Sequence, residues 1–227
     1  MTVTDVNVVK SAIFERPDDA NKGTLGSLLC VCGSYGMAGA AVMSAKGALR
    51  TGIGLAKCAL PRSIYPIVAQ TILESVYYPL SENADGRISK VNVPFLVSKS
   101  CKSSATLVGC GLGVCDDTLK IVFSLIENSA TPLVLDADAL NCVAKQPEIL
   151  LRKKAPIIIT PHPGEMSRLT GLATPLVNAE RERVALDFAQ KYGVVTVLKG
   201  AGTVIASPHG KVHCNTAGKS GMATVGS

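Results

Sequence analysis

The sequence predicts an α/β protein with a mainly parallel central sheet and helices on both faces. Short apolar runs alternate with segments of helical periodicity, the pattern of strands joined by crossover helices. The chain has 227 residues, 47% of them hydrophobic and 18% charged, which suffices for one domain with a sizeable core. Aromatic residues make up only 4%, so the core must be aliphatic, as buried parallel strands prefer.

The first half of the chain predicts three strands and a helix of small residues. The strands are expected at residues 28–32, 55–60 and 72–77, and the helix at 40–50, ended by Gly52. Residues 79–92 are rich in Ser, Asn, Asp and Gly, and we expect them to form an exposed excursion rather than a domain boundary.

The second half predicts more strands and helices, followed by a hairpin. Strands are expected at residues 105–108, 132–135, 156–159 and 194–198, and a β-hairpin at 203–207 and 211–215 around Pro-His-Gly.

Three helices are expected between these strands. Asp116 or Asp117 can cap the first, whose apolar positions are Leu119, Val122, Phe123 and Ile126. The second is short and runs from Glu165 to a stop at Gly171. Asn178 can cap the third, which runs through Tyr192 to Gly193.

Charge and cysteine content narrow the classes of partner. The net charge is +6, but the tight basic run at 152–154 has no interleaved aromatics, so an anionic small ligand is expected and no nucleic acid. None of the eight cysteines forms a CxxC pair or has a histidine at zinc-ligand spacing, which predicts free thiols, no metal site and a cytoplasmic location.

No membrane partner is expected from the sequence. The start carries no signal-peptide pattern. Residues 23–45 are uncharged and long enough for a span, but Gly-Ser-Tyr-Gly at 33–36 favours a strand, a loop and a helix.

Four predicted strand ends finish in loops that could carry chemistry. They lie at residues 33–39, 109–113, 136–141 and 160–165. Carboxyl ends of parallel strands meet at one edge of a sheet, where glycines let backbone amides approach an anion. Residues 160–165 (TPHPGE) are the most informative, because two prolines restrict the backbone around His162. The loop at 33–39 lacks dinucleotide-binding glycine spacing and by itself favours a flexible turn.

Other polar residues leave alternatives open. Residues 199–203 could cradle a nucleotide or form a tight turn with a surface lysine. Asp136 and Asp138 could each be a metal ligand, a general base or a cap. Asp136, at the strand end, is the better functional candidate, whereas Asp138 equally well caps or orders the turn. Gly-Lys-Ser at 218–220 is no P-loop, because His213 stands where the motif needs glycine.

Six motifs together resemble a known family. They are 21–26 (NKGTLG), 36–41 (GMAGAA), 108–113 (VGCGLG), 135–141 (LDADALN), 160–165 (TPHPGE) and 198–203 (LKGAGT). In this order they resemble the NAD(P)H-hydrate dehydratases, carbohydrate-kinase-like enzymes of nicotinamide nucleotide repair, from about residue 20 onward. The glycine loops are weak signals alone, but the ordered set with PHPGE is specific.

The resemblance implies a ribokinase-like fold and a repair reaction. Hydrated NADH or NADPH (NADHX or NADPHX) would lose water at nicotinamide C6 at the expense of ADP, the favoured nucleotide, or ATP, with Mg²⁺. Phosphoryl transfer to the C6 hydroxyl would make phosphate the leaving group, and the ring nitrogen would push electrons as it departs. Homo-oligomers are common in the family.

The resemblance also implies roles for particular residues. Ala40, Gly111 and His162 match substrate-contacting positions. The positions matching the family's nucleotide-binding residues are Lys199, Gly200, Ala201, Gly202, Thr203 and Gly226. No catalytic residue is assigned within the chain, because the expected catalytic Asp would follow Ser227.

The chain departs from the family in three places. Asn21 replaces the usual His, Cys110 replaces the proline of a GPG loop, and the sequence stops at Ser227. We therefore expect one domain over residues 1–227 that lacks the family's C-terminal helices, leaves apolar surface open and has no fused epimerase domain. We do not expect these 227 residues to be active by themselves.

Two other functions remain as alternatives. A kinase of a small thiazole or pyrimidine alcohol would share the fold, although PHPGE argues against it. A nucleotide-binding protein without catalysis would bind ADP or ATP but not turn over the hydrate.

Overall fold

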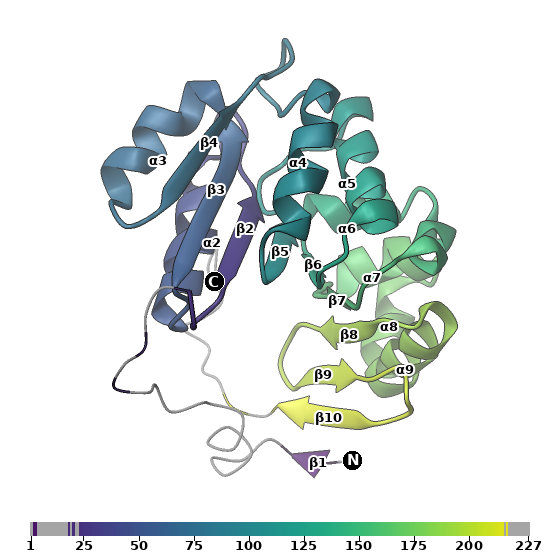
Figure 1. The fold of residues 1–227 in the computed structure, drawn as a ribbon. Coiled ribbons are helices and arrows are strands. Elements are labelled where there is room, and N and C mark those ends of the chain that lie inside the picture. Colours follow the sequence, from purple (N-terminus) through teal and green to yellow (C-terminus); the bar gives the residue numbers. More distant parts are fainter. Residues whose placement is uncertain (1, 4–17, 19, 21–22, 216, 218–227) are drawn as a thin grey trace.

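A computed structural model of the chain describes residues 2–3, 18, 20, 23–215 and 217. Ten strands form one sheet in the order β1-β10-β9-β8-β7-β6-β5-β2-β3-β4 (Figure 1). The strands are β1 (Thr2–Val3), β2 (Ser27–Val31), β3 (Leu55–Pro61), β4 (Val76–Leu80), β5 (Ala105–Val108), β6 (Leu133–Leu135), β7 (Ile157–Ile159), β8 (Val195–Leu198), β9 (Thr203–Ala206) and β10 (Val212–Asn215).

Eight α-helices are described between these strands. They are α2 (Ala38–Arg50), α3 (Tyr65–Thr71), α4 (Val93–Cys101), α5 (Asp116–Asn128), α6 (Asp138–Val143), α7 (Pro163–Thr170), α8 (Thr174–Ala179) and α9 (Arg181–Tyr192). Three 3₁₀ turns accompany them, at Arg62–Ile64, Lys90–Asn92 and Pro147–Arg152.

The strands from β2 to β8 all pair in parallel, as predicted. The chain runs from β2 outward to β4, then returns to β5 on the other side of β2 and continues to β8. The direction of winding therefore reverses between β2 and β5, where ligands of open α/β sheets bind. β9 is antiparallel to β8 and β10, which confirms the predicted hairpin.

The two faces of the sheet belong to different cores, because side chains alternate along each strand. Leu29 and Val31 of β2 face the larger core, which includes buried residues of α4, α5, α6, α7 and α9. Cys30 and Cys32 face a smaller core built with α2 and α3. Ile158, the middle residue of β7, is 37% exposed between two buried isoleucines, so apolar surface is open on one face there.

Most strand predictions are confirmed, but the one at residues 72–77 is wrong by about four residues. Ile72 ends α3, where its backbone N–H bonds to the oxygen of Val68, and β4 begins at Val76. α3 and α4 have no counterpart among the predicted helices. Pro66 and Pro94, in the first turns of these helices, are signals that could have located them.

The predicted helix caps need two corrections. Cys115, rather than Asp116 or Asp117, caps α5, through a reciprocal pair with Thr118. Asn178 lies inside α8 and does not cap α9, which starts at Arg181. The two glycine stops, Gly171 and Gly193, are confirmed, and both adopt the left-handed conformation.

The segment at residues 79–92 is only partly the exposed excursion that was predicted. Its first residues belong to β4, and Ile88 is fully buried in the larger core. The oxygen of Gly86 accepts a hydrogen bond from the backbone N–H of Tyr35 at 2.9 Å. The segment is therefore anchored against the loop that follows β2.

Candidate functional site

The four predicted loops meet at the carboxyl edge of the sheet, beside the β2–β5 switch point. The backbone N–H of Gly33 donates to the oxygen of Cys110 at 2.9 Å, and the Ser34 hydroxyl donates to the oxygen of Gly111 at 2.8 Å. The loops after β2 and β5 are thus joined to each other. They form one wall of the site.

Ala40 and Gly111, both predicted to contact substrate, lie against each other in this wall. Gly111 has a φ of +65°, and a Cβ placed on it would lie 2.7 Å from the Ala40 Cβ. Any larger side chain at either position would push the first turn of α2 away from the loop after β5. The structure brings these residues together; their contact with substrate stays a prediction.

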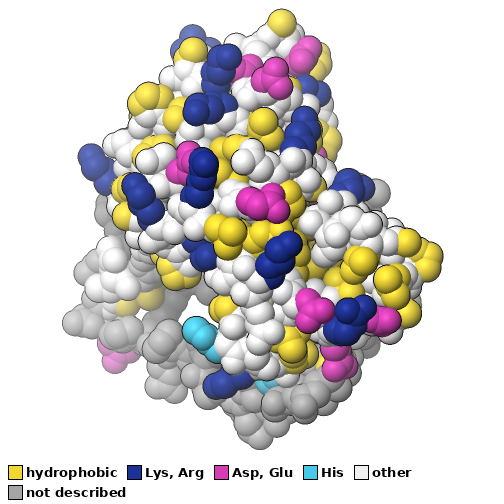
Figure 2. Space-filling view, turned by 90° about the vertical axis from the view of Figure 1, so that its right-hand side faces the viewer, with side chains coloured by type: hydrophobic (Ala, Val, Ile, Leu, Met, Phe, Trp, Pro, Cys, Tyr) yellow, Lys and Arg dark blue, Asp and Glu magenta, His cyan; other side chains and the backbone are white. Residues whose placement is uncertain are grey.

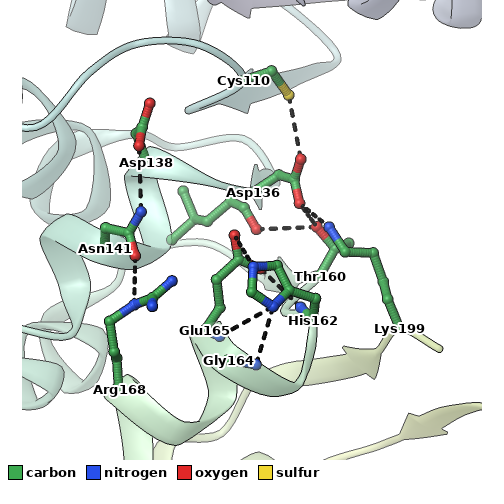
Figure 3. A network of polar contacts seen from close by, with 11 residues as sticks. Cys110, Asp136, Asp138, Asn141, Thr160, His162, Gly164, Glu165, Arg168 and Lys199 are labelled. Atoms are coloured by element: carbon green, nitrogen blue, oxygen red, sulfur yellow. Dashed lines mark hydrogen bonds and ion pairs between the residues drawn. The ribbon is translucent and has the colours of Figure 1, made fainter. Parts of the chain in front are cut away.

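Asp136, at the end of β6, is the centre of the polar contacts in the site (Figure 3). One carboxylate oxygen, Oδ1, accepts from the Thr160 hydroxyl at 2.7 Å and from the Lys199 ammonium at 2.6 Å. The other, Oδ2, faces the Cys110 thiol at 3.5 Å. Burial by itself would raise the pKa of Asp136, but hydrogen bonds from Lys199 and Thr160 outweigh it and hold the pKa below its usual value.

The backbone around Asp136 is unusual. Among the described residues other than glycine, only Ala137 has a positive φ, with φ +50° and ψ −115°. Gly109 packs so closely that a Cβ on it would lie 2.0 Å from the backbone carbonyl oxygen of Asp136. Strain of this kind persists where the surrounding structure enforces it, often at functional sites.

Asp138 orders the glycine loop. Its Oδ2 accepts from the backbone N–H of Gly113 at 2.8 Å, and its Oδ1 accepts from the Asn141 amide at 3.3 Å. Both oxygens are used within the loops, so the turn-ordering alternative raised by the sequence fits Asp138.

His162 caps helix α7 with its side chain. Its Nδ1 accepts from the backbone N–H groups of Gly164 at 3.0 Å and Glu165 at 3.4 Å, while Glu165 Oε2 accepts from the His162 backbone N–H at 2.8 Å. Because Nδ1 is an acceptor, this network assigns the proton of a neutral ring to Nε2, which lies 3.5 Å from Glu165 Oε1. The ring is half exposed, so it can present that N–H or its face to a ligand.

Residues 199–203 form the turn between β8 and β9, and Arg181 supports them from α9. The Arg181 guanidinium donates to the oxygens of Leu198 at 2.8 Å and Lys199 at 3.1 Å. Gly200 and Gly202 have φ values of +145° and +68°, conformations that glycine adopts without strain. The Thr203 hydroxyl donates to the oxygen of Gly200 at 3.0 Å, and Ala201 is exposed at the tip.

Two contributions escaped the sequence analysis. Arg181 carried no local signal, because the carbonyls it holds are 17 and 18 residues away. Arg87 lies against the glycine loop, where a Cβ on Gly113 would come within 2.5 Å of its Nε. Gly226, predicted to bind nucleotide, lies outside the described residues.

The described residues offer neither a ready-made metal site nor a membrane span. No group of three or more His, Cys, Asp or Glu side chains there is placed to hold a metal ion. No described helix is long and apolar enough to cross a membrane. All eight cysteines are free thiols, four of them buried.

Comparison with known proteins gives a consistent result. The family model described as NAD(P)H-hydrate dehydratase matches residues 28–227. The chain is 40% identical over 212 residues to the bifunctional NAD(P)H-hydrate repair enzyme of Thermofilum pendens, covering 93% of this chain and 40% of that protein. It is 33% identical to the ADP-dependent (S)-NAD(P)H-hydrate dehydratase of Neisseria meningitidis, covering 93% of this chain and 68% of that protein.

Solved structures agree with this result and confirm the ribokinase-like fold. The ADP/ATP-dependent NAD(P)H-hydrate dehydratase of Bacillus subtilis, co-crystallised with ATP and Mg²⁺, superposes with a TM-score of 0.80 at 30% identity, covering 97% of this chain and 74% of that one. A ribokinase-like protein of Enterococcus faecalis shares the fold with a TM-score of 0.83 at 21% identity. The chain spans 40% of the length of the Thermofilum relative.

Proposed function

This chain belongs to the NAD(P)H-hydrate dehydratase family, and we propose that its site dehydrates NADHX or NADPHX at the expense of ADP or ATP. One observation carries the proposal. The wall containing Ala40 and Gly111 and the turn at 199–203 reach the same edge of the sheet. Asp136 lies between them, with Oδ1 2.6 Å from the Lys199 ammonium and Oδ2 3.5 Å from the Cys110 thiol of the wall. A phosphoryl donor and an acceptor could therefore meet there.

The nucleotide would supply the phosphoryl group that converts the C6 hydroxyl into a good leaving group. In our proposal the turn at residues 199–203 holds the nucleotide with its glycine amides, while Arg181 keeps the neighbouring carbonyls turned away. His162, fixed by its own cap, orients the nicotinamide end of the substrate. Lys199 brings positive charge to the place where phosphate charge develops.

Mg²⁺ fits this site as an ion that enters with the nucleotide. Magnesium usually keeps several waters and binds through one or two carboxylates plus substrate phosphates rather than in a cage of protein ligands. No such cage is gathered in the described part of the chain, and in our proposal the ion is held mainly by the phosphates of the nucleotide. When bound, the ion would neutralise phosphate charge.

The finer assignments are also proposals. We favour ADP, supported by the name of the Neisseria relative, although the Bacillus relative is described as ADP/ATP-dependent. Free thiols support a reducing, cytoplasmic location. On the face drawn in Figure 2, Lys and Arg side chains are interspersed with Asp and Glu, which supports a small-molecule partner over nucleic acid. A homo-oligomer rests on the family alone.

The test is a turnover assay on the protein expressed from its complete gene. NADHX and Mg²⁺ are incubated with ADP, with ATP or without nucleotide, and NADH absorbance is followed. We expect a nucleotide-dependent rise that His162→Ala reduces by about tenfold to a hundredfold, the usual effect of losing one positioning group. Nucleotide-induced thermal stabilisation without any rise would refute the dehydratase and favour a kinase of a small alcohol or a non-catalytic binder.

A further inference from the structure

We propose that Asp136 is a positioning residue that holds the Lys199 ammonium across the end of β7, beside the turn at 199–203, so that the amine acts in phosphoryl transfer. The inference rests on the proposed function and assigns the pair a role within it.

The contact links strands that are not neighbours. β8, which ends next to Lys199, is separated from β6, which ends at Asp136, by β7. The lysine side chain therefore crosses the end of β7 to reach the carboxylate, and Thr160 at that strand end donates to the same oxygen. One oxygen thus ties together the ends of three strands (Figure 3).

The ammonium still has hydrogen-bonding capacity for a ligand. It has three N–H donors, and Asp136 is its one partner among the described residues. The Lys199 side chain is 42% exposed and that of Asp136 is 24% exposed, so an anion can reach the pair. A lysine held in place before the ligand arrives loses less conformational entropy on binding.

The local backbone supports a specific placement of Asp136 rather than a chance surface ion pair. Ala137 adopts a conformation that L-residues avoid. A side chain at position 109 would clash with the backbone oxygen of Asp136, so only glycine fits there. Ala137 directly follows Asp136, and Gly109 of the neighbouring loop packs against the Asp136 backbone oxygen, so both features constrain the turn that carries the carboxylate. An exposed ion pair without such support would contribute little.

Two other roles for Asp136 fit less well. A general base works best with a pKa near the working pH, and the pKa of Asp136 is held below its usual range. As a magnesium ligand it would have to share Oδ1 with two donors or use Oδ2, which faces Cys110. The positioning role uses the contacts as they stand.

A double-mutant cycle tests the proposal in the complete gene product. Asp136→Asn, Lys199→Met and the double variant are compared in kcat and in KM for nucleotide. We expect each single variant to lower kcat about a hundredfold with a much smaller change in KM, and the double variant to be no slower than Lys199→Met. If the loss of kcat in the double variant equalled the product of the two single losses, the proposal would be overturned, because Asp136 would then act independently of Lys199.

The Mg²⁺ requirement separates the competing metal role. We expect Asp136→Asn to leave the Mg²⁺ concentration for half-maximal rate within about threefold of wild type, since the proposed ion is held by phosphates. A much higher Mg²⁺ concentration for half-maximal rate in Asp136→Asn would make Asp136 a metal ligand and overturn the proposal. Thr160→Val, which removes one hydroxyl and keeps the carboxylate, serves as a second variant if Asp136→Asn folds poorly; it should lower kcat severalfold.

A labelling experiment remains informative even if the hydrate is not the substrate. Lysines are acylated with the N-hydroxysuccinimide ester of acetate, and labelling of Lys199 is measured by mass spectrometry against exposed Lys120 of α5. The ion pair should shield Lys199, so Asp136→Asn should raise the ratio severalfold. An unchanged ratio would mean that the pair does not hold the amine in solution, which would overturn the proposal whatever the reaction is.

Discussion

Lys57 lies at the edge of the sheet where the parallel strands begin, and Lys199 lies at the edge where they end. Their ammonium groups differ in how many of their N–H donors have a hydrogen-bond partner. Lys57, near the start of β3, donates to Ser27 Oγ at 3.0 Å, to the oxygen of Lys102 at 3.0 Å and to Ser103 Oγ at 3.1 Å. Its three donors are all occupied. Burial lowers the pKa of the Lys57 ammonium, and the Lys99 charge adds to that effect.

The surroundings of the two lysines differ in the same way. At the Lys57 edge, Ser100, Thr106 and Ser129 are fully buried, and the Ser100 hydroxyl bonds to that of Thr106 at 2.9 Å and to that of Ser129 at 2.7 Å. At the Lys199 edge, the carboxylate of Asp136 is partly exposed and lies next to a strained residue. At the first edge the buried polar groups have hydrogen-bond partners, as in a structural network. At the second edge, donors remain for a ligand, as in a binding site. Remaining hydrogen-bonding capacity, rather than polarity itself, distinguishes them.

The largest expected difference between the edges is in turnover. Lys199→Met should lower kcat about a hundredfold, because positive charge is removed where phosphate charge develops. The matched control, Lys57→Met, should keep wild-type kcat while lowering the melting temperature. A similar loss of kcat in both variants would show that the difference between the lysines has no functional meaning.

Stability should respond at the other edge. Ser100→Ala removes the shared partner of two buried hydroxyls and should lower the free energy of unfolding by about 1–3 kcal/mol, measured by urea denaturation. Ser98→Ala, on the exposed side of the same helix, should change it by less than about 0.5 kcal/mol. Equal effects of the two substitutions would contradict the structural role of the buried hydroxyls.

Strain at the site edge predicts a stabilising substitution. Ala137→Gly should raise the free energy of unfolding by about 1 kcal/mol, since glycine tolerates the positive φ that alanine does not. Ala144, in an ordinary helical conformation after α6, provides the opposite control, because glycine there should be destabilising. A loss of stability in Ala137→Gly would show that the conformation is not strained.

The smallest expected effect is in the pH dependence of stability. The folded pKa of Asp136 lies below its ordinary value of 3.8, so folding favours the ionised form. The resulting stabilisation is present above that ordinary value and is lost as the pH falls through the folded pKa. Asp136→Asn should therefore lose less stability than wild type on acidification below about pH 4, measured by urea denaturation at each pH. Parallel curves would contradict the assignment.

Local sequence patterns predict most individual strands and helices of this fold, but they do not predict contacts between residues far apart in the sequence. Apolar runs bounded by Gly, Pro or Asp located β2, β3, β5, β6, β7 and β8. Ile72 and Leu73 suggested a strand, although Ile72 ends a helix and Leu73 is 83% exposed in the turn after it. Periodicity does not separate such short apolar runs from helix ends.

The loops that form the candidate site were predicted from the sequence, but the side-chain contacts between these loops were not. Convergence of the strand ends followed from parallel pairing alone. The pair of Asp136 and Lys199 did not, because 63 residues separate them and the contact depends on strand order. The sequence favoured Asp136 over Asp138 because of its place at the strand end, but it could not decide whether Asp136 is a metal ligand, a general base or a cap, because that depends on its long-range partners.

The most direct test is a crystal structure of the complete gene product with ADP, Mg²⁺ and NADH. We expect a nucleotide phosphate within hydrogen-bonding distance of Lys199 Nζ, with the Asp136 contact retained and the nicotinamide near His162. A nucleotide bound away from residues 199–203, or Lys199 turned away from both the phosphate and Asp136, would contradict this expectation.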